Sequence, residues 1–513
     1  MKSHFTILVL LGFFFTIINP GNIFAATVES VPGGVSNWSD GSTWVGGFAP
    51  NPGDDIIING TVYLNLSTTM NDVTVNAGGA LISLGGTRTL SITGNITNHG
   101  TLQSSGYALN LNINGNIYHD GILWANGITS LTGTTDQEIW SSSTFSGSSF
   151  NSVVSAKNII ITSDNISFEG CNIDINDVNV VFANGQLSVT GGYITDMVVT
   201  ANELDITMND GAYLDDFSCF ANYVRLHDLV NIHTDVVFDD NDYEVTVEVV
   251  DTLQNTTGGN RLLTVNGNLH NNGYIRNNIY ALNIDVAGSV VNSGSWTNYI
   301  TNLIGDGNQF LTFNAEFAGA NFTSNMVEGG IATATNALRF TGTQINFNGD
   351  SLYMNAGNDS IFMDGGYMYD ITIIAGASPW QIYCYQSNSA YYDNADIEGD
   401  DVVFDGTFDI LSYFNVKGNA RVEGVFQNRS SGSQVASING NLTNNGTIQD
   451  NVYNLTLNVA GDINQNGIWT NNSTFLTGVN DQNFTFTSVF EGANFTSSKP
   501  NGKVISHSTL SFN

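Results

Sequence analysis

Positive charge is the component that this sequence most lacks. Among 513 residues there are 12 lysines and arginines against 46 aspartates and glutamates, which gives a formal net charge of −34 at pH 7. Because phosphate groups are bound by clustered cations, this balance argues against a nucleic-acid partner and against an anionic membrane surface. An acidic surface is compatible with divalent cations or with simple solvation.

Proline and cysteine are scarce as well, with 6 and 3 residues. A secreted fold held together by disulfides would carry more cysteines, in an even number. We therefore interpret Cys171, Cys219 and Cys384 as buried apolar residues or unpaired thiols, with a Cys171–Cys219 disulfide as the alternative. Long helix-forming stretches are missing, whereas glycine (55 residues), asparagine, threonine and serine are abundant. This composition predicts an all-β chain rich in tight turns.

Only one apolar run approaches the length of a membrane span. It covers residues 5–18, "FTILVLLGFFFTII", follows the positive charge of Lys2, and precedes small residues around Ala25. This order predicts a cleaved secretory signal peptide over residues 1–25, with a membrane anchor as the alternative. We therefore expect a secreted or bacterial cell-surface protein without membrane insertion.

A long internal repeat dominates the rest of the chain. "ITGNITNHGTL" at 92–102 returns as "VNGNLHNNGYI" at 265–275 and as "INGNLTNNGTI" at 438–448. The spacing between successive copies is about 173 residues, and such self-similarity at a fixed period is typical of a solenoid. After Gly121 the first and second copies differ by a single position in register, so that Phe145 is matched by Phe317 and then by Phe490.

A shorter period lies inside the long one and predicts the fold. Gly79, Gly100 and Gly121 recur at a period of about 21 residues, with short apolar alternations between them, as the coils of a β-solenoid require. This period fits a right-handed parallel β-helix, with Ile92, Ile96 and Leu102 facing inward. We expect glycine and asparagine to occupy corners with positive φ. An array of β-sandwiches is the alternative, but the short period does not suit it.

The repeat also predicts how the chain is divided. Residues 26–88 form an N-terminal cap and the first coils, followed by a first copy at 89–261, a second at 262–434 and a third at 435–513. A copy of this length holds about eight coils by the repeat logic of a solenoid. Because the sequence stops inside the third copy, we expect it to be truncated.

The segment before the repeats reads "NWSDGSTWVGGFAPNPGDDIIING". Trp38 and Trp44 are expected to cover the open end of the core, which every solenoid must protect. In the alternative interpretation they stack on sugars, while Asp54 or Asp55 holds calcium.

This segment resembles the beginning of secreted, Asn/Gly-rich surface proteins of Bacteroidetes-type bacteria. Its "PNPGDDI" is similar to the strand-initiating motif of the G8-type β-helical module, and the "NNGTI" phrases resemble those of β-helical adhesins. The resemblance is specific for 37–84 and implies a β-helix, export and an extracellular role. It carries over no catalytic residue.

Residues that could support chemistry are few. The densest acidic cluster, "DDNDYE", supplies Asp239, Asp240, Asp242 and Glu244 as candidate calcium ligands, although its spacing differs from that of an EF-hand loop. Adjacent aspartates on a strand point to opposite faces, so their pairs are interpreted as turn residues rather than as a glycosidase dyad. Lys417, Arg421 and Arg429 form the only basic group that a polysaccharide lyase could use.

These observations favour a protein without catalysis. We expect an elongated, monomeric surface or extracellular stalk, an adhesin that contacts a polysaccharide or a cell-surface glycan. Trp296 and Trp469 are matched across the copies and would stack on sugars if exposed, whereas repeated aromatics more often pack in a core. The alternatives are a β-helical polysaccharide lyase or glycoside hydrolase, and a structural spacer for a further domain.

Overall fold

The structure is built almost entirely from short strands that pair in parallel with the strands of neighbouring coils. The computed structural model describes residues 26–513 except 155–156, 183–184, 241–244, 328–329, 356–358 and 377–380. The predicted signal peptide lies outside this range. The described chain forms 58 β-strands and one 3-10 turn at Gly41–Thr43, with no α-helix among these residues. No helix in the described part of the chain is long and apolar enough to cross a membrane.

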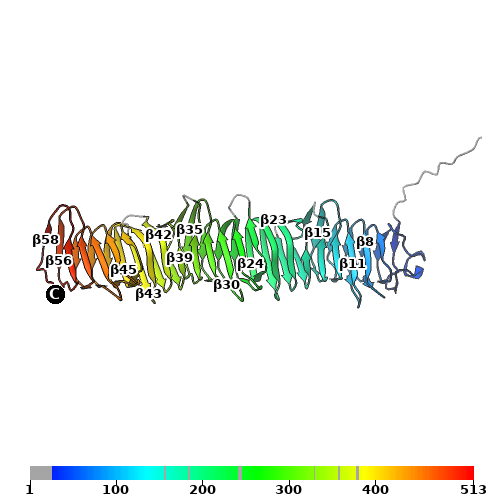
Figure 1. The fold of residues 1–513 in the computed structure, drawn as a ribbon. Coiled ribbons are helices and arrows are strands. Elements are labelled where there is room, and N and C mark those ends of the chain that lie inside the picture. The colour runs from blue at the N-terminus through cyan, green and yellow to red at the C-terminus, as the bar shows by residue number, and fades with distance from the viewer. Residues whose placement is uncertain are drawn as a thin grey trace, which may run out of the picture.

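Most strands bury every second side chain and pair with the strand one coil later. β11 (Leu109–Ile113) buries its three apolar residues, and its two asparagines face outward. It lies parallel to β8 (Arg88–Ile92) of the preceding coil, with Leu109 opposite Arg88. The result is the predicted right-handed parallel β-helix, drawn out into the rod of Figure 1.

Three parallel ladders form the three sides of the rod. In the N-terminal part, ladder 1 contains β1 (Thr27–Glu29), β3 (Asp55–Ile58), β6 (Val73–Val75), β9 (Ile96–Asn98), β12 (Ile117–His119), β15 (Gln137–Ser141), β18 (Asn158–Ile161) and β21 (Asn179–Phe182). Ladder 2 contains β2 (Val35–Asn37), β4 (Thr61–Leu64), β7 (Ala80–Ser83), β10 (Thr101–Gln103), β13 (Leu123–Ala125), β16 (Thr144–Phe145), β19 (Asn165–Glu169) and β22 (Gly185–Thr190). Ladder 3 contains β5 (Thr68–Met70), β8, β11, β14 (Ile128–Leu131), β17 (Ser149–Ser152) and β20 (Asn172–Asp174).

Two long strands, β23 (Tyr193–Asn209) and β24 (Tyr213–Ile232), bend through all three sides and continue the ladders. Beyond them, ladder 1 contains β25 (Val236–Asp239), β28 (Arg261–Val265), β31 (Leu282–Val286), β34 (Ile300–Leu303), β36 (Asn321–Ser324) and β39 (Gln344–Asn346). Ladder 2 contains β26 (Val245–Val249), β29 (Gly267–Asn271), β32 (Val290–Asn292), β35 (Asn308–Phe313), β37 (Ile331–Ala334) and β40 (Ser351–Met354). Ladder 3 contains β27 (Thr252–Asn255), β30 (Tyr274–Asn277), β33 (Ser295–Thr297), β38 (Leu338–Thr341), β41 (Asp359–Asp364) and β43 (Gln381–Ser387).

In the C-terminal part, β42 (Tyr367–Ala375), β44 (Tyr391–Glu398) and β45 (Asp401–Ile410) each span two sides. Ladder 1 then continues through β48 (Val425–Asn428), β51 (Thr447–Gln449) and β54 (Ile468–Thr470). Ladder 2 continues through β46 (Phe414–Val416), β49 (Gln434–Ile438), β52 (Leu455–Val459), β55 (Ser473–Leu476) and β57 (Asn494–Ser497). Ladder 3 continues through β47 (Asn419–Val422), β50 (Leu442–Asn444), β53 (Ile463–Gln465), β56 (Gln482–Phe486) and β58 (Val504–Ser506).

Matched strands of successive copies lie on successive sides of the rod. β9 belongs to ladder 1, its match in the second copy is the end of β29 on ladder 2, and its match in the third copy is β50 on ladder 3. One copy therefore contains eight turns and one further side, so that each copy is turned by a third of a revolution relative to the previous one.

The core repeats its polar contacts together with its apolar ones. Gln137 is buried and its Nε2 donates to the carbonyl oxygens of Ile113 and Gly115, at 3.1 and 2.7 Å. Gln309 and Gln482 donate to the matched carbonyl oxygens of their own copies. Because an unpaired buried amide is costly, these repeated bonds fix the register of the coils.

The glycines of the short period correct one expectation. Gly100, Gly121 and their matches do not have positive φ. A Cβ added at Gly294 would lie 2.0 Å from the carbonyl oxygen of Gly273, one coil away. Glycine is needed there because two backbones approach closely. Positive φ is found instead at other corners, including Asp196 and Asn394.

Candidate functional site

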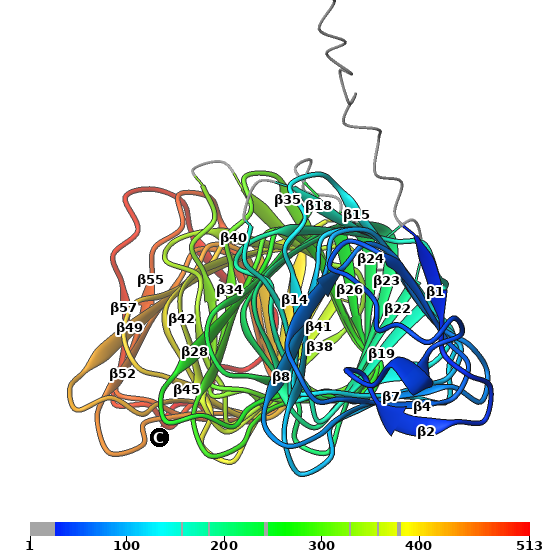
Figure 2. The ribbon, with the colours of Figure 1, turned by 90° about the vertical axis from the view of Figure 1, so that its right-hand side faces the viewer.

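The four tryptophans that were candidates for stacking on sugars are buried, which corrects that interpretation in favour of packing. Trp38 and Trp44 are 1 and 2% exposed and pack edge to face, with ring centroids 5.0 Å apart. They belong to the N-terminal segment, whose strands and 3-10 turn lie in front of the end of the rod in Figure 2, as expected for a cap. Trp296 and Trp469 are fully buried, and their Nε1 atoms donate to buried asparagines.

The predicted calcium ligands are only partly described. Asp242 and Glu244 lie outside the described residues. The Asp239 carboxylate accepts hydrogen bonds from the Asp240 backbone N and from Asn266 Nδ2. Among the described residues, no group of three or more histidines, cysteines or acids is arranged to hold a metal ion. Calcium binding at this cluster therefore stays a prediction.

The predicted basic group is neutralised by acids. Lys417 Nζ lies 3.9 Å from carboxylate oxygens of both Asp396 and Glu398. Arg421 contacts Asp401 and Glu423 at 3.3 and 3.0 Å. Arg429 lies 3.7 Å from Asp409. The three cysteines are buried and unpaired, as expected.

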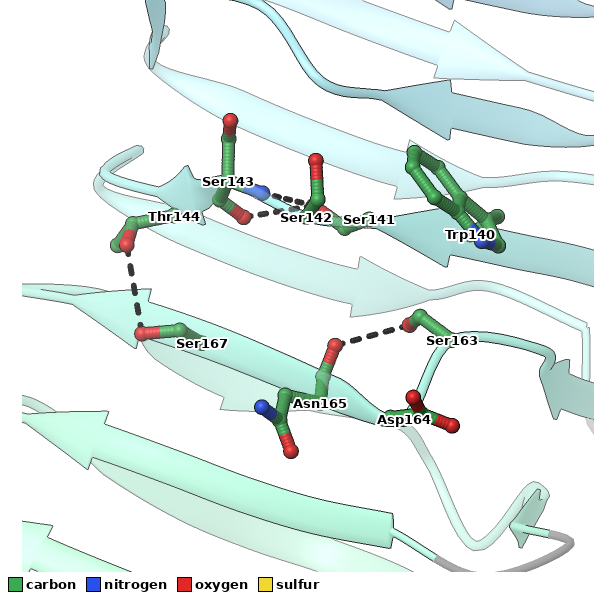
Figure 3. A pocket seen from close by; sticks show the side chains of 9 residues that line it. All are labelled: Trp140, Ser141, Ser142, Ser143, Thr144, Ser163, Asp164, Asn165 and Ser167. Carbon is green, nitrogen blue, oxygen red and sulfur yellow. Dashed lines mark hydrogen bonds between the residues drawn. The ribbon is translucent and has the colours of Figure 1, made fainter.

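An open surface hollow lies in the first copy, at the corner between ladders 1 and 2. It has a volume of about 400 Å³, within the range of small-molecule sites. Figure 3 shows the side chains that line it: Trp140, Ser141, Ser142, Ser143, Thr144, Ser163, Asp164, Asn165 and Ser167. We call this site the Trp140 hollow.

Strand geometry turns these side chains outward. In β15 the buried residues are Gln137, Ile139 and Ser141, so that Trp140 between them faces out. The next corner exposes the hydroxyl groups of Ser142 and Ser143, and the corner one coil later exposes Asp164 and Asn165. Two neighbouring coils thus supply the two walls of the hollow, with Trp140 at one end (Figure 3).

Several polar groups of the hollow are available to a ligand. Ser141 Oγ and Ser163 Oγ donate to backbone carbonyl oxygens at 2.6 and 2.9 Å and are thereby occupied. Within the described part of the chain, no hydrogen bond or ion pair engages the Asp164 carboxylate. In the same part of the chain, no other group forms a hydrogen bond with the hydroxyl groups of Ser142 and Ser143. One aromatic wall therefore stands beside several free donors and acceptors.

The aromatic wall continues along ladder 1. Tyr118, one coil earlier, stacks on Trp140 with ring centroids 4.2 Å apart and an interplanar angle of 7°. His99 packs edge to face against Tyr118 at 5.5 Å and is hydrogen-bonded to Asp120. Aromatic stacking holds these long side chains in place before any ligand arrives.

Beneath this wall lies a buried histidine. His119 ring nitrogens contact Asn98 Nδ2 and the Thr144 carbonyl oxygen at 3.2 and 3.3 Å, and its ring packs against Trp124 and Phe145. Burial lowers the pKa of His119, although the backbone groups of Thr144 and Asn98 and the nearby Asp120 oppose the shift. Burial thus favours the neutral imidazole.

The second copy has hydrogen bonds between the coils at the same position. Thr312 replaces Trp140, and its hydroxyl group contacts that of Thr335 one coil later. Asn336 replaces Asp164: its Oδ1 accepts from the Phe313 backbone N, and its Nδ2 donates to Asn314 Oδ1 at 3.2 Å. These bonds join the two coils where the first copy has a hollow.

The sequence contained a signal for this site that the repeat obscured. Tyr118 and Trp140 stand where the second copy has Val291 and Thr312 and the third has Asn464 and Thr485. A large aromatic residue at an outward position, present in one copy only, marks a surface that has diverged from the repeat. Comparison of the chain with known protein families, with curated proteins and with solved structures gives no match.

Proposed function

We propose that this elongated β-helical solenoid is an exported surface or extracellular stalk that binds a glycan at the Trp140 hollow. The observation that carries the proposal is the pairing of an outward aromatic ring with free hydroxyl, amide and carboxylate groups. A sugar ring offers an apolar face of C–H groups and a rim of hydroxyl groups, which this arrangement complements. Export rests on the predicted signal peptide, and the stalk acts as a monomer.

The charge of the surface selects among glycans. The chain carries a net charge of −34, and among the described residues that line the hollow the only charged side chain is the carboxylate of Asp164. An anionic polysaccharide would be repelled by both. An uncharged glycan is therefore the partner that the hollow fits best.

A second candidate function is glycoside hydrolysis. A neighbouring hollow of about 290 Å³ is lined by three acids, Asp164, Glu203 and Asp205, together with Arg225. Glycoside hydrolases use two carboxylates on either side of the scissile bond. Both Glu203 and Asp205 are engaged by Arg225, at 3.6 and 2.8 Å, which favours a structural role for them.

The test is retention of the purified secreted chain on immobilised uncharged polysaccharides, with simultaneous assay for new reducing ends. We expect retention without cleavage, and a loss of at least tenfold in Trp140→Thr, which installs the residue of the second copy. Thr312→Ala is the matched control and should bind like the parent chain. A parallel arm with a calcium chelator tests whether calcium contributes to the contact.

Each outcome points to one function. Equal retention of Trp140→Thr and the parent chain would contradict the proposal. New reducing ends that disappear in Asp164→Asn would establish the enzyme instead. If the chain neither binds nor cleaves any uncharged polysaccharide, the glycan-binding proposal and the enzyme are both contradicted, and the structural spacer remains.

A further inference from the structure

A straight row of outward side chains leads away from the Trp140 hollow along the axis of the rod. Asn165 is the register partner of Gln186, Gln186 of Asp205, and Asp205 of Arg225. These residues occupy four successive coils on ladder 2. Asp164 and Asn165 line both the Trp140 hollow and the neighbouring one, so the two hollows adjoin.

The length of this row is set by the spacing of strands. Neighbouring strands are about 4.8 Å apart, so four steps from the Trp140 coil to the Arg225 coil cover roughly 19 Å, the length of an extended chain of about four hexose rings. The row is polar throughout. Gln186 Nε2 donates to Thr207 Oγ1 at 2.9 Å, which holds the amide in place.

The far end of the row meets a cluster of charged side chains around Arg225. The Arg225 guanidinium contacts Asp205 at 2.8 Å and Glu203 at 3.6 Å, and lies 4.7 Å from the centre of the Tyr223 ring. Glu248, one coil further on, lies 4.0 Å from Arg225 and accepts a hydrogen bond from the Tyr223 hydroxyl. These contacts pair the charged groups at this end of the row with one another.

We infer that the row is a binding lane for an extended, uncharged chain of about four β-linked hexoses, which lies parallel to the rod with one end in the Trp140 hollow beside Ser142 and the other against the Arg225 cluster. The inference rests on the proposed function and adds the length, direction and charge of the ligand. The carboxylates of Asp164, Glu203 and Asp205 against one guanidinium give the lane a net negative charge, which disfavours uronic acid chains.

Length dependence tests the inference. The full secreted chain is titrated by calorimetry with β-1,4-linked glucose oligomers of two to six rings, with α-1,4-linked oligomers as the coiled control. We expect affinity to rise about tenfold from two to four rings and to stay constant from four to six. Gln186→Ala should remove part of that rise and leave the affinity for the dimer unchanged. A β-1,4-linked tetramer of glucuronic acid should bind at least tenfold more weakly than the glucose tetramer.

The outcomes separate the lane from the site. If the dimer binds through Trp140 but affinity does not grow up to four rings, the lane is absent and the proposed function stands. If affinity still grows from four to six rings, the lane does not end at the Arg225 cluster, and the inference is overturned. Equal affinity for the acidic tetramer overturns the charge selection. No binding of any β-linked oligomer contradicts the proposed function itself.

Discussion

The Trp140 hollow and the matched position in the second copy lie over the same buried glutamine contacts and differ on the outside. Inside, Gln137 and Gln309 make the same buried bonds, since each donates to two matched carbonyl oxygens of the preceding coil. Outside, Trp140 borders a hollow, whereas Thr312 and Asn336 are bonded across the coils.

This difference shows where each part of the sequence is constrained. Inward residues are constrained by register, because a lost partner leaves a buried polar group or a cavity. Outward residues of a solenoid contact few neighbours and can diverge without unfolding the coil. A functional surface is therefore expected where one copy departs from the others.

The largest effect should come from the shared interior. Trp124→Ala and Trp296→Ala each remove a fully buried ring at nearly matched positions. We expect each to lower the free energy of unfolding by about 3–5 kcal/mol. Urea unfolding measures the cost, and hydrogen exchange locates the loosened coils. Costs that differ by more than about 2 kcal/mol would contradict the equivalence of the two interiors.

The next largest effect should come from the outward residues of the Trp140 hollow and concerns glycan affinity. The triple variant Trp140→Thr, Ser142→Asn and Asp164→Asn gives the first copy the outward residues of the second. We expect glycan affinity to fall at least tenfold, about 1.4 kcal/mol, while the free energy of unfolding changes by less than about 0.5 kcal/mol. Binding and unfolding are measured on the same preparation. A variant that binds normally would show that the hollow is not the site.

A smaller effect concerns the pH dependence of stability, because the first copy buries His119 where the third copy has Gln465. Burial lowers the pKa of His119 below its ordinary value of 6.5. The unfolded chain then binds a proton more readily than the folded chain, so the contribution of His119 is complete above pH 6.5 and is lost as the pH falls below it. His119→Gln copies Gln465, which accepts from Asn444 Nδ2 at 2.8 Å.

We therefore expect His119→Gln to lose less stability than the parent chain between pH 7.5 and 5.5, as measured by urea midpoints at both values. Part of the pH dependence should persist, because burial also lowers the pKa of His233 and His270. An unchanged pH dependence would indicate that protonation of His119 costs nothing in the fold.

The smallest effect belongs to exposed ion pairs. Arg421 contacts two acids, and more than a third of its side chain is exposed. Arg421→Gln should change the free energy of unfolding by less than about 1 kcal/mol, and salt should reduce the difference. A cost above about 2 kcal/mol in urea unfolding would give these pairs a larger role than surface pairs usually have.

The repeat predicted the fold because periodicity reports directly on burial. Residues such as Ile96 and Leu102 are fully buried, as their alternation indicated. The role of the periodic glycines was harder to predict, since a close approach between coils is a property of the stacked structure and not of a local sequence. Trp296 and Trp469 are not sugar contacts, because residues that recur at matched positions of the copies pack in the core. Trp140 was overlooked because it is repeated in no other copy.

The third-of-a-turn offset between copies determines how the rod meets its surroundings. Tyr107, Tyr280 and Tyr453 are matched residues on exposed corners, 53, 40 and 41% accessible, that follow strands of ladders 2, 3 and 1. They therefore lie on three different corners of the rod, and the three copies together complete one revolution about its axis. A feature kept through duplication can thus engage neighbours all around the rod, whereas the Trp140 hollow lies on one side of it, at the corner between ladders 1 and 2.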